Sequence, residues 1–259
     1  MHGFPVSLEA EQGVASPGLL CLTGGGGKTT LLFALGRAFA AAGQRVLGTT
    51  TTRMYRPSSI PGLTVTFPDN PEGISVPANG FVFAAKNPPP DGDPAKVHGY
   101  APEVIDELHR RGAASRIIVE ADGAAGRPLK APADHEPVIP ATTGAVIAVI
   151  GLSCFCKPFS AAAVFRPERV SAITGLSPED AITPGAVVAL ITHREGLFKN
   201  TPPQALRLLF CNQADLPGTH EPMRALAGIL AGEHPGFLHG LYAGSLQQEG
   251  LLCRRLIPA

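Results

Sequence analysis

The feature of this sequence that most constrains its fold is an apolar run, Leu19–Leu22, followed by four consecutive glycines and a Lys-Thr-Thr triplet. Glycines let backbone N–H groups converge on phosphate oxygens in conformations that a Cβ atom would forbid. The N-terminus of a following helix adds partial positive charge, Lys28 can reach β- and γ-phosphates, and the Thr29 hydroxyl can ligate Mg²⁺. The residues expected to bind a nucleoside triphosphate here are Gly24, Gly25, Gly26, Gly27, Lys28, Thr29 and Thr30.

The spacing of this loop differs from the common pattern G-x-x-x-x-G-K-[ST], because Leu22 occupies the position of the first glycine. The shorter pattern G-x-x-G-K-T-T fits instead, and it resembles the loop of Mur-type amide ligases. Apolar residues then recur at helical spacing, and Gly43 is placed to end that helix. These apolar residues are Leu31, Leu32, Leu35 and Phe39. The alternative is a glycine-rich hairpin that binds no ligand.

Composition and charge narrow the class of protein. Hydrophobic residues make up 44% of the 259 residues, which is enough for a sizeable core. The 21 basic and 21 acidic side chains balance, so no overall field favours nucleic acid or an anionic membrane. No apolar run reaches membrane-spanning length, and five irregularly placed cysteines do not form a disulfide pattern. We therefore expect a cytoplasmic protein that binds neither nucleic acid nor membranes.

The order of apolar runs predicts a P-loop NTPase-like α/β fold of three layers, with a mostly parallel sheet and helices on both faces. We expect a single domain over residues 1–259, with a Pro- and Gly-rich insertion at about 54–100. Inside that insertion, apolar runs at 63–67 and 81–85 indicate a hairpin-like pair. The loop at 87–94 is placed to cover the site.

Polar side chains follow two of the predicted strands. One predicted strand ends in Thr49–Thr52 and Arg53, and another ends in Glu120 and Asp122. Carboxyl ends of parallel strands meet at one edge of a sheet, where ligands bind. One carboxylate would hold Mg²⁺ through water, and the other would orient a nucleophile. The alternatives are that the threonines reflect β-propensity and that the acids cap a turn. The expected metal ligands are Thr29, Thr50, Glu120 and Asp122.

A proline-stiffened loop, 126–137, follows the acidic strand end directly. Arg127 and Lys130 suit an anionic group, either a γ-phosphate or a substrate. His135 and its two acidic neighbours suit a base or metal ligands. A charged loop that is simply solvated is the alternative. The expected catalytic residues are Lys28, Glu120, Asp122, Arg127, Lys130 and His135.

Two further motifs leave choices open. Asn212 and Asp215 follow an apolar strand and resemble the N-K-x-D element that reads guanine, although Gln213 replaces the lysine. The expected cofactor is therefore Mg²⁺ with either ATP or GTP. Cys154 and Cys156 would point to opposite faces of an extended segment, which does not favour joint binding of a soft ion.

Taken together, these motifs make the sequence resemble the YqeC family. The matching stretches are Gly24–Thr30, Thr49–Thr52, Val119–Ala124, Arg127–Pro140, Val149–Leu152, Arg166–Glu168 and Asn212–Asp215. The resemblance implies an accessory role in assembling selenium-dependent molybdenum hydroxylases. It also implies a partner, either an apo molybdenum hydroxylase or a carrier of a selenium or molybdenum cofactor.

Three functions remain open from the sequence. The leading hypothesis is hydrolysis of ATP or GTP that drives cofactor assembly or insertion. The second is an ATP-dependent ligase or kinase, favoured by the Mur-like spacing, in which Arg127, Lys130 and His135 hold a small acid. The third is an adaptor that binds nucleotide without turnover and captures a partner. Turnover that requires a co-substrate would indicate the second, and the absence of turnover would indicate the third.

Overall fold

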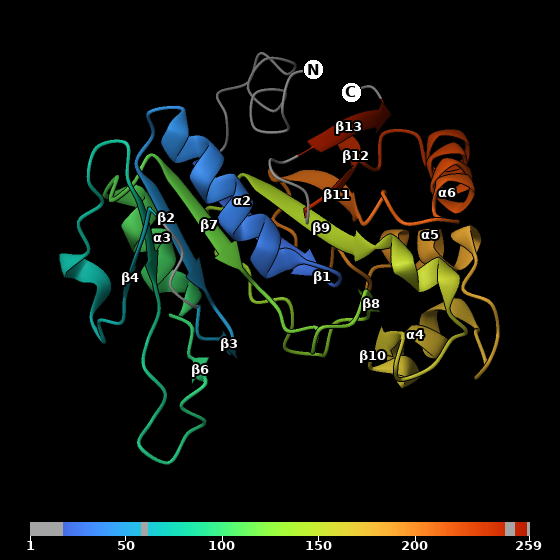
Figure 1. The fold of residues 1–259 in the computed structure, drawn as a ribbon, viewed down its shortest axis with the longest axis horizontal. Coiled ribbons are helices and arrows are strands. Elements are labelled where there is room, and N and C mark those ends of the chain that lie inside the picture. Colours follow the sequence, from blue (N-terminus) through green and yellow to red (C-terminus); the bar gives the residue numbers. More distant parts are fainter. Residues whose placement is uncertain (1–17, 58–61, 247–251, 258–259) are drawn as a thin grey trace.

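The computed structural model describes residues 18–57, 62–246 and 252–257, with a nine-stranded sheet at its centre (Figure 1). Its strands are β1 (Leu19–Gly24), β2 (Val46–Thr50), β4 (Leu63–Thr66), β5 (Phe81–Ala84), β7 (Arg116–Glu120), β9 (Ala145–Gly151), β11 (Leu206–Asn212), β12 (Gly240–Ser245) and β13 (Leu252–Ile257). Their spatial order is β13-β12-β11-β9-β1-β7-β2-β5-β4. In the described sheet only β12 and β13 pair in antiparallel fashion, so the predicted mostly parallel sheet is confirmed.

Continuous apolar runs explain the central strands. Every residue of β1 and of β9 is buried, and in β7 only the first residue is partly exposed. Strands of this kind are typical of parallel sheets, because helices cover both of their faces. The buried middle of the sheet therefore supports the loops that follow the carboxyl ends of β1, β7 and β9.

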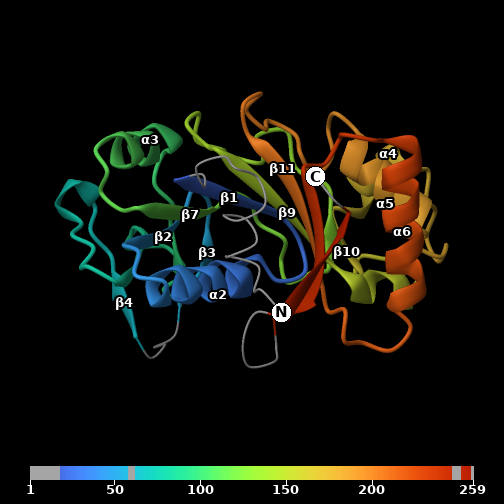
Figure 2. The same cartoon turned by 90° about the horizontal axis from the view of Figure 1, so that it is seen from above.

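Helices lie on both faces of this sheet (Figure 2). On one face, α2 (Lys28–Ala41) buries the apolar residues that the sequence places at helical spacing. The helices of the other face are α3 (Pro102–Arg110), α5 (Pro184–Thr192) and α6 (His220–Glu233), and α4 (Pro167–Thr174) packs against α5. The two faces have separate apolar cores. The predicted three-layer α/β architecture is therefore confirmed.

The strand order places the glycine loop where the chain reverses direction across the sheet. From β1 the chain passes through α2 to β2, returns to β7 beside β1, and then reaches β9 on the opposite side of β1. In open α/β sheets, ligands bind outside the carboxyl ends of the strands at such a reversal. The loop that follows β1 occupies this position.

The region predicted as an insertion, 54–100, differs in part from expectation. Its two apolar runs form β4 and β5, which pair in parallel at the edge of the central sheet and are not a hairpin. The reason is the connection over 67–80, which is long enough for a crossover between parallel strands. The rest of the region is an arm. Its base is an antiparallel ribbon of β3 (Met54–Tyr55) and β6 (Lys96–Val97), and its loop at 87–94 protrudes from the body (Figure 1).

Four short elements complete the described fold. The 3₁₀ turns are η1 (Pro71–Gly73) and η2 (Leu152–Cys156), and β8 (Leu129–Lys130) pairs with β10 (Val164–Phe165). The segment with the two neighbouring cysteines is thus a turn rather than extended, with Cys154 buried and Cys156 exposed. None of the described helices is both long and apolar enough to cross a membrane.

The contact between α2 and the sheet depends on Gly36. A Cβ atom at Gly36 would lie 2.2 Å from Cζ of Phe81 on β5. We predict that Gly36→Ala lowers the free energy of unfolding by about 1–3 kcal/mol, because overpacking outweighs the gain in helix propensity. Chemical denaturation followed by circular dichroism measures the change.

Gly228→Ala in α6 is the matched control, because nothing lies within 4 Å of a Cβ atom there. This substitution should raise the free energy of unfolding by about 0.5–1 kcal/mol, as a helix gains from replacing glycine by alanine. Equal effects at the two positions would contradict the packing described for α2.

Candidate functional site

The glycine loop is held in place by the surrounding protein. Its first three N–H groups donate to fixed acceptors: Gly24 to Asp122 Oδ2 (3.0 Å), Gly25 to Val149 O (2.8 Å) and Gly26 to Arg127 O (2.9 Å). Gly24 has a φ of +88°, and a Cβ atom there would lie 2.3 Å from Val149 O. A phosphate would therefore bind the N–H groups of the first turn of α2, which has no side-chain cap.

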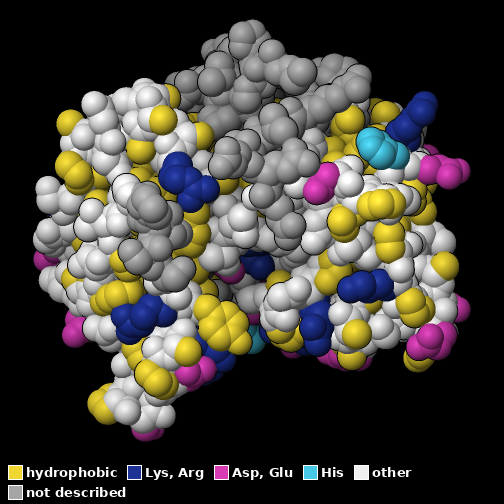
Figure 3. Space-filling view, viewed as in Figure 1, with side chains coloured by type: hydrophobic (Ala, Val, Ile, Leu, Met, Phe, Trp, Pro, Cys, Tyr) yellow, Lys and Arg dark blue, Asp and Glu magenta, His cyan; other side chains and the backbone are white. Residues whose placement is uncertain are grey.

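A cavity of about 700 Å³ opens at this edge of the sheet. Its volume lies in the range of small-molecule sites, about 300–1,000 Å³. Figure 3 shows a hollow in the middle of this face, with basic and acidic side chains visible inside it. The glycine loop and the first turn of α2 line its centre. The base of the arm, the end of β7 with residues 123–126 and Pro128, the turn after β9, the end of β11 and the residue after β12 line the rest.

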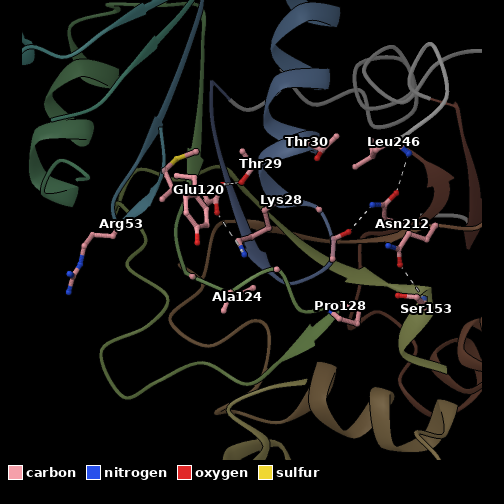
Figure 4. A pocket seen from close by; sticks show the side chains of 18 of the residues that line it. Lys28, Thr29, Thr30, Arg53, Glu120, Ala124, Pro128, Ser153, Asn212 and Leu246 are labelled. Atoms are coloured by element: carbon pink, nitrogen blue, oxygen red, sulfur yellow. Dashed lines mark hydrogen bonds and ion pairs between the residues drawn. The ribbon is translucent and has the colours of Figure 1, made fainter. Parts of the chain in front are cut away.

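Lys28, Thr29 and Glu120 converge at the centre of the cavity (Figure 4). Lys28 Nζ lies 2.6 Å from Gly24 O, 3.2 Å from Asp122 Oδ1 and 4.0 Å from Glu120 Oε1. The Thr29 hydroxyl donates to Glu120 Oε2 at 2.7 Å. The pairing of β1 with β7 brings these groups together, because the glycine loop follows the first strand and Glu120 ends the second. Two motifs that are far apart in the sequence thus form one site.

The environment of Glu120 favours an added cation. The side chain is buried, and burial raises the pKa of this carboxyl group above its usual range, against the lowering effects of the Lys28 charge and the Thr29 hydrogen bond. Burial penalises the charged form of a carboxyl group, and a nearby positive charge stabilises it. A cation placed beside Glu120 would therefore be favoured.

The oxygen atoms of Thr29 and Glu120 fit Mg²⁺ that arrives with phosphate. Mg²⁺ keeps several waters and takes one or two protein carboxylates together with phosphate oxygens. In the described parts of the chain, no three His, Cys, Asp or Glu side chains form a group that could hold a metal ion. Thr29 and Glu120 supply one hydroxyl and one carboxylate, a donor set that fits a metal ion shared with a ligand.

The Thr50 hydroxyl, a predicted metal ligand, lies elsewhere. It is fully buried in β2, 2.9 Å from Glu120 O and 3.1 Å from Thr52 O. The Thr49 hydroxyl donates to Ala84 O at 2.8 Å. These hydroxyl groups connect β2 to its neighbouring segments and do not line the cavity.

Asp122 belongs to a row of alternating charges that starts at Glu120 and Lys28 and leads away from the cavity. It is fully buried, and its Oδ2 atom lies 3.0 Å from Nζ of Lys130, which is also fully buried. Lys130 donates to Glu136 Oε2 at 2.7 Å, and Arg166 donates to the same oxygen at 2.6 Å. The loop over 126–137 is therefore packed into the protein, and Lys130 balances two buried carboxylates rather than facing the cavity.

Three other residues predicted to be functional also lie outside the cavity. Arg127 donates through Nε to Ala161 O at 2.8 Å. His135 and Asp215 are exposed, and neither lines the cavity.

Sequence reasoning missed several residues that do line the cavity. Tyr55 and Lys96 come from the ribbon at the base of the arm, and Lys157 follows η2. None of them belongs to a recognisable motif. Tyr55 and Lys96 are about forty positions apart in the sequence, and the pairing of β3 with β6 brings them together.

Asn212 and Gln213 support the loops around the cavity. Asn212 Nδ2 donates to Gly26 O at 2.7 Å, and its Oδ1 accepts from Leu246 N at 3.2 Å. Gln213 has a φ of +68°, and its Oε1 accepts from Ser153 N at 3.2 Å. The Asn212 amide thus ties the glycine loop to the segment after β12, and the choice between guanine and adenine stays open.

The charge row makes stability depend on pH through Glu136. Burial alone would raise the pKa of this carboxyl group, but the hydrogen bond from Arg166 and the charge of Lys130 outweigh it and lower the pKa from 4.5 to about 2. A lowered pKa gives stability that is present above the unfolded value and is lost as the pH falls through the folded value. We predict that Glu136→Gln lowers the free energy of unfolding by about 2–3 kcal/mol at neutral pH.

The difference between Glu136→Gln and the unaltered protein should shrink as the pH falls from 4.5 toward 2. Urea denaturation at a series of pH values measures it. Glu195→Gln is the control, because its carboxylate pairs with Lys199 at 2.8 Å but is half exposed, so little effect is expected. A Glu136→Gln difference that stays constant down to pH 3 would contradict the account.

Comparison with known proteins assigns the chain to a family. The family model described as YqeC protein matches residues 20–168, which include the glycine loop and the charge row as far as Arg166. A protein of Escherichia coli (strain K12), described as uncharacterized protein YqeC, is 35% identical over 246 residues, covering 93% of this chain and 92% of the relative. No solved structure matches the chain. The chain belongs to the YqeC family.

Proposed function

We propose that this protein binds ATP or GTP with Mg²⁺ in the cavity after β1 and hydrolyses it. The observation that carries the proposal is the convergence of Lys28, Thr29 and Glu120 at the first turn of α2, where the sheet order reverses. A phosphate there meets the partial positive charge of a helix N-terminus, unpaired N–H groups and a buried lysine. Sequence pattern and geometry support this function separately.

Each of these groups has a defined task in the proposed reaction. Lys28 Nζ carries three donors and gives one hydrogen bond to Gly24 O, while Asp122 Oδ1 lies 3.2 Å away as an ion-pair partner, so Nζ has donor capacity left for a β- or γ-phosphate. Mg²⁺ held by Thr29 and, through water, by Glu120 would neutralise charge on the terminal phosphates. The Glu120 carboxylate would also accept a hydrogen bond from the attacking water and orient it. Asp122 positions Lys28 and the loop.

The family resemblance suggests what this step serves. We infer that nucleotide hydrolysis drives maturation of selenium-dependent molybdenum hydroxylases, by cofactor assembly or insertion. The partner would then be an apo-hydroxylase or a carrier of a selenium or molybdenum cofactor. Pull-down of such a partner only in the presence of nucleotide would support this inference.

Calorimetric titration of the purified protein with non-hydrolysable ATP and GTP analogues plus Mg²⁺ tests the proposal. We predict binding at one site, and a preference for one analogue identifies the base. Lys28→Ala should weaken binding at least about tenfold, because a hydrogen bond to a charged group contributes about 1.5–3 kcal/mol. Equal affinity of Lys28→Ala and the unaltered protein would contradict the proposed site.

Two further variants sharpen this test. Arg37→Ala removes a positive charge from an exposed position of the same helix and should leave the affinity unchanged. Thr29→Val keeps every charge and should weaken binding only when Mg²⁺ is present. Slow phosphate release from the purified protein and a natural nucleotide would distinguish hydrolysis from an adaptor that binds without turnover.

A further inference from the structure

The cavity extends past the phosphate-binding centre toward the base of the arm. Arg53, Met54, Tyr55 and Lys96 line this end, which we term the arm end. The opposite end is lined by residues that follow β9, β11 and β12. Figure 4 shows Arg53 and Asn212 on opposite sides of Lys28. The cavity therefore has two ends with the glycine loop between them.

Strand order gives the scale of this arrangement. The arm follows β2 and Asn212 ends β11, and each of these strands lies two positions from β1. At a strand spacing of about 4.8 Å, each end lies about 10 Å to one side of the glycine loop. A nucleotide whose phosphates bind at Lys28 can extend its sugar and base toward only one of the two ends.

The position of Glu120, at the end of β7, indicates in which direction the sugar and base of a bound nucleotide would extend. Glu120 ends β7, and this strand lies between β1 and β2. The Glu120 carboxylate accepts a hydrogen bond from the Thr29 hydroxyl. Mg²⁺ and the terminal phosphate would therefore lie on the side of β7, toward the arm. The sugar and base would then run toward β9 and β11. The arm end stays free and faces the terminal phosphate.

The side chains of the arm end indicate what else it binds. Tyr55 is 70% exposed, the largest exposed fraction among the big hydrophobic side chains of the described residues. Lys96 Nζ lies 5.5 Å from the centre of the Tyr55 ring, and Arg53 lies at the same rim. An exposed ring beside two cations can stack on a planar group while the cations pair with its negative charge.

The charge of the whole lining supports a second anion. Its basic side chains are Lys28, Arg53, Lys96 and Lys157, and its one acidic side chain is Glu120. One nucleotide engages Lys28 and the end where Lys157 lies. A nucleotide bound in this way would not reach the two cations of the arm end. Lys96 has an exposed carboxylate partner, Asp93 at 3.5 Å, and an ion pair of this kind is weak enough to be exchanged for a ligand anion.

We propose that the arm end is a subsite for a second ligand, an anion with an aromatic ring, which stacks on Tyr55 and pairs with Lys96 and Arg53. The proposal rests on the proposed function, because it takes the glycine loop as the nucleotide site. The proposal also changes which residues would hold the acidic co-substrate in the ligase or kinase hypothesis. An acidic co-substrate would bind to Arg53 and Lys96, not to Arg127, Lys130 and His135, which lie outside the cavity.

Phenyl phosphate is a suitable probe, because it carries one aromatic ring and one anionic group. Saturation-transfer NMR titration would be run with the full chain, Mg²⁺ and a saturating non-hydrolysable nucleotide analogue, which blocks the glycine loop. We predict that phenyl phosphate still binds. Tyr55→Ala should weaken it at least about fivefold, as expected for the loss of one ring stack. Lys96→Ala should also weaken it, and Tyr55→Phe should keep the affinity within about twofold.

Controls separate this subsite from the nucleotide site. Arg37→Ala, at an exposed position of α2 outside the cavity, should leave phenyl phosphate binding unchanged, and Tyr55→Ala should leave the affinity for the analogue within about twofold. Loss of phenyl phosphate binding on saturation with the analogue would overturn the subsite. So would a large loss of analogue affinity in Tyr55→Ala, because the nucleotide base would then occupy the arm end. Failure of the analogue itself to bind would instead contradict the proposed function.

Discussion

The structure around the cavity depends on how one fully buried carboxylate, Asp122, is neutralised. Its oxygens lie 3.2 Å from Lys28 Nζ and 3.0 Å from Lys130 Nζ, and Oδ2 accepts from Gly24 N at 3.0 Å. Removing one partner of a buried ion pair costs about 3–5 kcal/mol. The folded state therefore favours an arrangement in which both lysines and the glycine loop lie against this side chain, and this arrangement gives the loop its shape.

This constraint extends beyond the loop as a row of six alternating charges. From the cavity outward the members are Glu120, Lys28, Asp122, Lys130, Glu136 and Arg166, and their formal charges cancel. Arg166 directly precedes α4, so the row connects the cavity to that helix. On the proposed function, a phosphate bound to Lys28 would change the electrostatic balance at Asp122 and, through it, along the row. The buried charged groups of the row thus hold Lys28 and the glycine loop in position beside the cavity.

Local patterns predicted much of the fold and which residues lie together at the centre of the candidate site. The glycine loop, α2 and the central strands follow from short-range spacing, and Glu120 follows from its place at a strand end. Other features depend on contacts between distant residues. The sequence does not reveal that β4 and β5 pair in parallel, that the Thr50 hydroxyl braces a neighbouring strand, or that Lys130 balances buried carboxylates. The ring of Tyr55 enters the cavity lining only because β3 pairs with β6.

A crystal structure of the protein with Mg²⁺ and a non-hydrolysable ATP or GTP analogue tests the central claim most directly. The account predicts phosphate oxygens within hydrogen-bonding distance of Lys28 Nζ and of the first-turn N–H groups of α2. It also predicts Mg²⁺ beside the Thr29 hydroxyl, and the base on the side of β11. An analogue bound elsewhere, with no phosphate at the glycine loop, would contradict the account.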